Sequence, residues 1–124
     1  EPAYNRRTIY RINVQSARDP LLDSLDCPDP STKTPARAIT TTPIQSLGLM
    51  NNEFVLRQAA EFAARLKMES GPRLREQIAH AYRLAFARQP SGAELKRAER
   101  FANENGVDSL CWVLVNSSEF LYIK

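Results

Sequence analysis

The feature that most constrains the fold of this chain is a series of helix-start signals, the first of which begins at residue 42. The segment from Thr42 to Gln45 places a hydroxyl at the N-cap, proline at the first helical position and glutamine three residues after the cap. This pattern is a capping box, in which two side chains satisfy backbone N–H groups reciprocally. Ser91 and Glu94 repeat the spacing. Two such starts in a chain of 124 residues predict a mainly helical protein.

Apolar residues after residue 42 recur at the three-and-four spacing of amphipathic helices. The predicted helices run from 42 to 70 with a weak point at 51–52, over 72–87, over 91–106, and over 109–122. The last of them is apolar nearly all round, so we expect it to be the most buried helix, with Asp108 as its cap. Helical spacing also makes Tyr82, Trp112 and Tyr122 core candidates. The fold class predicted is mainly α, with four to five helices in a compact bundle-like array.

The first 41 residues differ in composition, because they hold five of the eight prolines. Proline lacks the amide hydrogen and disfavours helix in the residue before it, so we predict an extended, Pro-rich N-terminal arm. Residues 8–14 alternate and are β-branched, which favours an extended segment lying across the helices or pairing with a domain outside this chain. The domain prediction is therefore a single domain over 1–124, with an irregular arm over 1–41 and a helical core over 42–124.

Composition excludes several classes of protein. No apolar run approaches the roughly 20 residues that cross a bilayer, so we predict no membrane span. The net charge is +3, with cations mostly interleaved with acids. The exception is the first eighteen residues, where Glu1 is the only acid and the arginines are Arg6, Arg7, Arg11 and Arg18. Nucleic-acid binding through these four is only a third and weaker hypothesis.

Two cysteines stand far apart in the sequence, Cys27 among prolines and Cys111 among apolar residues. The sequence alone leaves open whether they pair. It contains neither a Cys-x-x-Cys redox motif nor a haem-attachment motif. We predict free thiols, with Cys111 as a small buried hydrophobe.

Groups that carry chemistry are sparse. His80 is the only histidine and falls off the apolar helix face, so we expect it to be solvent exposed. No Cys, Asp or Glu cluster has metal-ligand spacing, and no nucleophile elbow or glycine-rich phosphate loop is present. We predict no catalytic, cofactor or metal site, and we do not expect this domain to be an enzyme by itself.

Several polar residues stand at or beside apolar runs: Arg37, Gln45, Asn51, Asn116 and Glu119. Gln45 and Asn51 are interpreted as helix caps, and Asn116 as a partner for backbone groups of the arm. A carboxylate on a buried helix needs a cation nearby. For Glu119 the candidate partners are Arg83, Arg88 and Arg37.

Several separated motifs occur in one order along the chain: Arg6 to Tyr10, Leu25 to Asp29, Thr40 to Leu47, Met50 to Val55, Ala81 to Pro90, and Leu114 to Tyr122. Together they resemble the planctomycete-secreted domain family of unknown function. The chain departs from the family pattern at Ser46, where alanine is usual, and at Phe86-Ala87-Arg88, where Leu-Gly-Arg is usual. The resemblance implies the C-terminal part of a large exported or periplasmic bacterial protein, downstream of a cytochrome-c-like domain.

The hypothesis that follows is a non-catalytic docking domain whose partners are the upstream domains of the same polypeptide, with other proteins as further candidates. The candidate interface residues are Arg6, Arg7, Tyr10, Arg37, Gln45, Asn51 and Asn116. The alternative is one wall of a redox or hydrolytic active site completed by the upstream cytochrome-like domains. In that alternative, Arg37 and Gln45 would contact the substrate.

Overall fold

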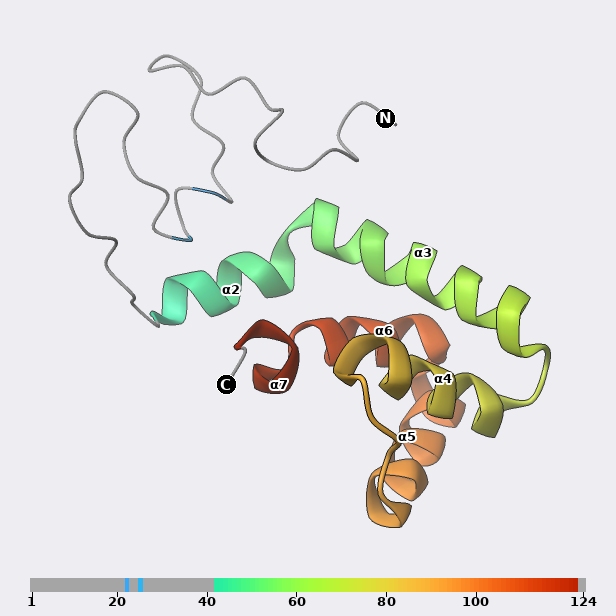
Figure 1. Cartoon of the computed structure of the whole chain (residues 1–124). Coiled ribbons are helices and arrows are strands. Elements are labelled where there is room, and N and C mark those ends of the chain that lie inside the picture. The colour runs from blue at the N-terminus through green and yellow to red at the C-terminus, as the bar shows by residue number, and fades with distance from the viewer. Residues whose placement is uncertain (1–21, 23–24, 26–41, 123–124) are drawn as a thin grey trace, which may run out of the picture. The chain divides into compact units, whose positions relative to one another are not determined.

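The computed structural model describes Leu22, Leu25 and residues 42–122 (Figure 1). The chain divides into two units, Glu1–Gly48 and Leu49–Lys124. The helices are α2 (Pro43–Asn51), α3 (Glu53–Ser70), α4 (Leu74–Phe86), α5 (Gly92–Asn105), α6 (Val107–Val115) and α7 (Ser118–Leu121). The described residues contain no strand, and the predicted mainly helical fold is confirmed. The arm predicted over 1–41 lies almost entirely outside the described residues.

The capping box predicted at the start of α2 is present. The backbone N–H of Thr42 donates to Gln45 Oε1 at 3.1 Å, and the N–H of Gln45 donates to Thr42 Oγ1 at 3.3 Å. Gln45 is buried, whereas Ile44, Leu47 and Met50 are exposed. Local chemistry therefore sets where this helix begins.

The weak point predicted at 51–52 separates α2 from α3. Asn52 is the N-cap of α3, and its Oδ1 accepts from the N–H of Phe54 at 2.9 Å. The cap is thus Asn52, and the interpretation of Asn51 as the cap was wrong by one residue, since Asn51 ends α2. Gly71 ends α3 at φ +68°, a backbone conformation that glycine adopts without strain.

The connection between α4 and α5 combines an unusual backbone with a second capping box. Ala87 ends α4 in the left-handed conformation, at φ 56° and ψ 23°. Ser91 then caps α5: its Oγ accepts from the N–H of Glu94 at 3.3 Å, and Glu94 Oε2 accepts from the N–H of Ser91 at 2.7 Å. The capping box predicted from Ser91 and Glu94 is confirmed.

The main core lies in the second unit, where α6 contacts α3, α4, α5 and α7. Figure 1 shows α3 as the longest helix, running beside the shorter α6. Alanine supplies both buried side chains of α5 and two of the three on α3, and the full set of buried core residues is Ala59, Ala63, Leu66, Ile78, Ala81, Tyr82, Ala98, Ala102, Leu110, Cys111 and Leu114. Small residues let the helices approach closely, which gives the short α6 its central place.

The single buried helix predicted over 109–122 was wrong. Its first part, α6, begins at Val107, so Asp108 lies in the first turn and Gly106 is the N-cap. The helix stops at Val115 because the side chains of Asn116 and Ser117 bond to the carbonyls of Trp112 and Leu114, at 2.9 and 2.7 Å.

The exposed short helix α7 follows this stop. Ser117 caps it by accepting from the N–H of Phe120. Tyr122, directly after α7, is 47% exposed, so the prediction that it is a core residue was wrong. The polar side chains at 116–118 therefore end one helix and start another within a run that is otherwise apolar.

None of the described helices combines the length and hydropathy needed to span a bilayer.

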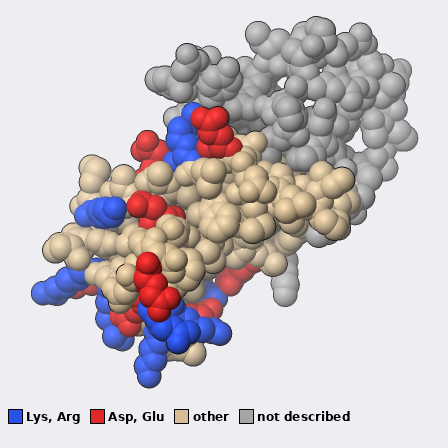
Figure 2. Space-filling model, turned by 180° about the vertical axis from the view of Figure 1, so that it is seen from behind, with Lys and Arg blue, Asp and Glu red and all other residues tan. Residues whose placement is uncertain are grey.

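On the face that Figure 2 shows, basic and acidic side chains interleave at the bottom of the view, the end where α5 lies. The region between this end and the top of the helices is largely uncharged.

Candidate functional site

The densest polar contact in the described residues centres on Arg88, just after the left-handed Ala87. Its Nε and Nη2 donate to the two carboxylate oxygens of Glu119 at 2.6 and 2.8 Å. Its Nη1 and Nη2 donate to the two oxygens of Glu94 at 3.0 and 2.7 Å, and Nη1 also donates to the carbonyl of Gln89. All five N–H donors of the guanidinium are therefore engaged. We call Arg88, Glu94 and Glu119 the arginine hub.

The hub rests on two aromatic rings. The guanidinium carbon of Arg88 lies 5.5 Å from the centroid of Tyr82 and 5.6 Å from that of Phe86, within cation–π range. The two rings meet edge to face at 5.2 Å. Burial raises the pKa of the Tyr82 hydroxyl, and the charge of Glu94 adds to that rise.

The hydrogen bonds of the hub favour the charged forms of Arg88 and Glu94. Bonds to Glu119 and then Glu94 raise the pKa of Arg88. The pKa of Glu94 is lowered to about 2, mainly by its hydrogen bonds from Arg88 and next by the one from the N–H of Ser91. Arg88 and Glu94 therefore stay ionised and paired over the whole neutral range.

The hub fixes the position of α7. A helix of four residues is not stable on its own, because nucleation costs more than so few hydrogen bonds return. The bidentate bond from Arg88 to Glu119 ties α7 to the start of α5. The prediction that Glu119 pairs with one of three arginines is confirmed for Arg88, although Glu119 itself is exposed.

Two hollows flank the hub. The first, of about 340 Å³, lies among α4, α5 and α6, and its walls include Tyr82, Phe86, Phe101, Leu110 and Arg97. The second, of about 1080 Å³, is a groove between the end of α4 and α7. Its lining residues are Leu84, Ala85, Phe86, Ala87, Ser118, Glu119, Phe120 and Tyr122. Phe86 and Glu119 line both, so they form the wall between the hollows.

Of the interface residues predicted from the sequence, Arg6, Arg7, Tyr10 and Arg37 lie outside the described residues. Gln45 is part of the α2 capping box, and Asn51 is the last residue of α2.

Asn116 ends α6 by donating to the carbonyl of Trp112. The indole Nε1–H of Trp112 donates in turn to the carbonyl of Met50 at 3.1 Å. Trp112 therefore links Asn116 to the residue before Asn51. Each of these bonds is structural. The interface role proposed for Gln45, Asn51 and Asn116 stays a prediction.

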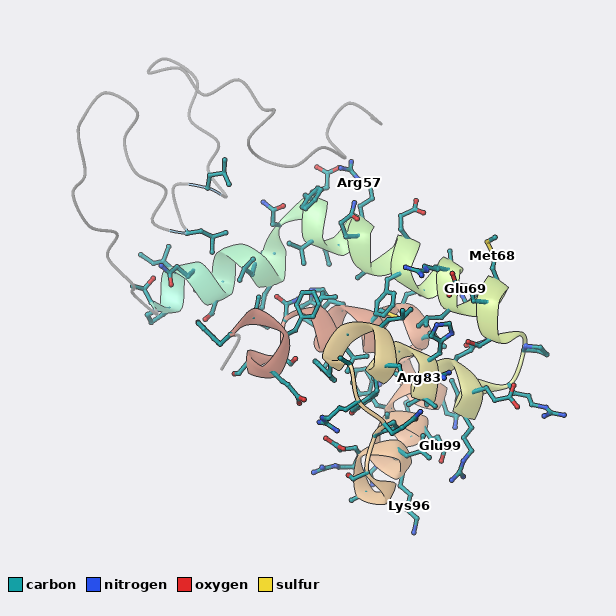
Figure 3. The ribbon with its side chains drawn as sticks, in the orientation of Figure 1. Arg57, Met68, Glu69, Arg83, Lys96 and Glu99 are labelled. Carbon is teal, nitrogen blue, oxygen red and sulfur yellow. The ribbon has the colours of Figure 1, made fainter. Side chains whose placement is uncertain are left out.

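A second polar cluster, which was not predicted from the sequence, joins α3 to α4. His80 Nδ1 lies 2.7 Å from Ser70 Oγ, and His80 Nε2 lies 3.3 Å from a carboxylate oxygen of Glu69. Arg65 donates to the other oxygen of Glu69 at 2.8 Å. Figure 3 shows Glu69 at the C-terminal end of α3, on the side of α4.

The side chain of His80 is 20% exposed, so the expectation of a solvent-exposed histidine was wrong. Neither Ser70 nor His80 lines the two hollows beside the hub. Sequence reasoning missed the cluster because the two residues face each other only once the turn at Gly71 brings α4 back along α3.

The prediction that Cys111 is a buried free thiol is confirmed. Burial raises the pKa of this thiol to about 12, so it stays protonated at neutral pH. Within the described part of the chain, no group of three or more His, Cys, Asp or Glu side chains is placed to hold a metal ion.

Comparison with known proteins gives one family. The family model PSD1, described as "Protein of unknown function (DUF1553)", matches residues 1–102. No curated protein and no solved structure matches the chain. The matched residues include Arg88 and Glu94, whereas Glu119, α6 and α7 follow the matched range.

Proposed function

Because the chain belongs to the PSD1 family of proteins of unknown function (DUF1553), we propose for it the role of a non-catalytic docking domain. Its partners are the upstream domains of the same large exported bacterial protein, with a cytochrome-c-like domain among them. The planctomycete-secreted character, the cytochrome-c neighbour and the export rest on the motif resemblance.

One observation carries the docking proposal: the arginine hub holds apolar side chains in solvent. Phe120 is 44% exposed and Tyr122 47%, and both line the groove with Leu84 of α4, which is also exposed. Adjacent exposed apolar side chains are typical of protein–protein interaction sites. We call Leu84, Phe120 and Tyr122 the docking patch.

The hub supports docking over catalysis at this site. All five donors of Arg88 are engaged by the protein itself, so the arginine has no donor left for a substrate anion. What the hub supplies is a fixed α7. A surface already held in one conformation loses less conformational entropy when a partner binds.

The test is an amide NMR titration of the chain with the separately expressed upstream region of its parent protein. We expect shifts around the docking patch, and a loss of affinity of at least about tenfold in Phe120→Ala. The matched control is Met68→Ala on α3, an apolar side chain that is 86% exposed and far from the hub in the sequence. Absence of shifts at the patch, or an equal loss in Met68→Ala, would contradict the proposal.

The second candidate function is that this chain forms one wall of a hydrolytic active site, and the cluster of Ser70, His80 and Glu69 supports it. A histidine whose Nε2–H faces a carboxylate leaves Nδ1 free to accept the proton of the serine hydroxyl, which is the arrangement of a general base beside a nucleophile. A fluorophosphonate probe would then label Ser70, and His80→Gln would abolish the labelling. Labelling no faster than that of an exposed serine such as Ser46 would exclude this function for the chain.

A further inference from the structure

We infer that the groove between α4 and α7 receives a basic side chain, arginine or lysine, with an apolar residue beside it in the partner segment. The inference rests on the docking function proposed above and adds the chemistry of the partner. It is carried by the size of the groove, by its exposed aromatic rings and by the sign of the charges around it.

The size and walls of the groove suit a short segment of another protein. Its volume of about 1080 Å³ is at the upper end of the range for small-molecule sites, so one side chain does not fill it. Leucine, alanine and phenylalanine supply five of its eight lining residues. Apolar side chains of a partner segment are therefore stabilised when they enter the groove and leave water.

Two aromatic rings of the groove are open to a cation. Phe120 and Tyr122 line the groove and are exposed. A cation within about 6 Å of the centre of an aromatic ring is attracted to the face of that ring. Arg88 makes this contact with other rings, those of Tyr82 and Phe86. No described cation lies over Phe120 or Tyr122, so a partner can supply one.

The charges beside the groove favour a cation over an anion. Glu119 lines the groove, and no described lysine, arginine or histidine does. Glu119 shares Arg88 with Glu94, so one cation faces two carboxylates and the arginine hub carries one net negative charge. The cation of Arg97 lines the smaller hollow on the other side of Phe86 and does not line the groove. An anionic partner would therefore be repelled here.

The C-terminal turn of α4 adds hydrogen-bond acceptors to the same wall. Leu84, Ala85 and Phe86 line the groove, and their carbonyls accept no hydrogen bond from another described backbone N–H. This end of a helix also carries the negative end of its dipole. Figure 3 shows the side chain of Arg83, the basic residue of this turn, well away from α7. The N–H donors of a guanidinium or ammonium group therefore match this wall.

The first experiment is an amide NMR titration of residues 1–124 with three tripeptides blocked at both ends. One is leucyl-arginyl-leucine, and its analogues have glutamine or glutamate in the middle. We expect saturable shifts on Leu84, Ser118 and Tyr122 with the arginine peptide, with a dissociation constant on the order of 1 mM. The glutamine peptide should bind at least about threefold more weakly, and the glutamate peptide more weakly still. Equal binding of the three peptides, no saturable shifts, or shifts confined to other surfaces would overturn the inference.

A charge placed in the groove provides the second experiment. Ser118 lines the groove as the exposed first residue of α7. Ser118→Lys should weaken binding of the arginine peptide and of the upstream region about tenfold by repulsion, whereas the neutral Ser118→Gln should change it by less than about twofold. Met68→Lys adds the same charge at an exposed site on α3 and should have little effect. The amide shifts of α7 check that each variant keeps its fold.

Failure of the docking function and failure of this inference give different results. If the upstream region causes no shifts at the docking patch, docking is contradicted and the inference loses its occupant. If the upstream region shifts the patch but Ser118→Lys and Ser118→Gln weaken binding equally, docking stands and the preference for a cation is overturned. Equal losses in Ser118→Lys and Met68→Lys would indicate general repulsion by the surface and would overturn the inference as well.

Discussion

At the scale of single residues, the clearest departure from favourable backbone geometry is Ala87 at φ 56°. The left-handed region costs an L-residue with a Cβ roughly 1–2 kcal/mol, and glycine avoids that cost. The family pattern that the motifs resemble has glycine at this place. Glycine, which the resembled motif carries at this place, would adopt the conformation of Ala87 without strain.

We therefore expect Ala87→Gly to raise the free energy of unfolding by about 0.5–1 kcal/mol, because the relief of strain exceeds the added entropy of the unfolded chain. The matched control is Ala85→Gly, two residues earlier in right-handed helix, which should lower it by about 1 kcal/mol. Urea unfolding measures both. Destabilisation by both substitutions would contradict the assignment of strain to Ala87.

Glu94 makes stability depend on acid pH. Its pKa is about 2 in the folded chain against 4.5 as a free group, so the stabilisation is fully present above about pH 4.5 and is lost as the pH falls toward 2. The urea midpoint should fall over this window, and less steeply in Glu94→Gln. Glu99→Gln, on the same helix, serves as the control and should keep the wild-type slope; equal slopes in all three proteins would exclude this role for Glu94.

Cys111 should be chemically silent in the native protein. It is 0% exposed and its pKa is raised to about 12, so the reactive thiolate is scarce and inaccessible. In a Cys27→Ser background, we expect no reaction with a disulfide reagent at pH 8 until urea unfolds the chain. Rapid native labelling would mean that α6 opens locally far more often than its packing indicates.

At the scale of elements, α7 depends on the hub more than on its own sequence. Glu119→Gln should break the bidentate bond from Arg88, release residues 118–122 and leave α3 to α6 intact. Amide hydrogen exchange and helical chemical shifts of α7 measure the release, while the urea midpoint should change little. Glu104→Gln, an exposed acid on α5, is the charge-matched control; an unchanged α7 in Glu119→Gln would show that Ser117 capping alone suffices.

The elements also show which parts of the fold were predictable from sequence. Both capping boxes are local patterns of four residues, so their helices began where predicted. The stop after Val115 depended on side chains bonding back to the preceding turn, which hydrophobic spacing does not register. The pairing of Ser70 with His80 depended on the angle between two helices, and the choice of Arg88 for Glu119 on where α7 lies.

At the scale of the whole molecule, the matched range of the family and the folding unit have different ends. The match stops at residue 102, before α6 supplies Leu110, Cys111 and Leu114 to the core. A fragment of residues 1–102 would leave the buried stripe of α3 uncovered. We expect it to lose cooperative thermal unfolding by circular dichroism, and a sharp transition in that fragment would contradict a core that needs α6.

The contact of α3 with α6 joins segments that are far apart in the sequence. The pairs α3–α4 and α4–α5 join neighbours in the sequence and close short loops, which takes little chain entropy. The link from Trp112 to the carbonyl of Met50 closes 62 residues at once. We therefore expect the packing of α6 on α3 to be the slow step of folding, so that the earlier helices become stably packed only when the last ones reach them.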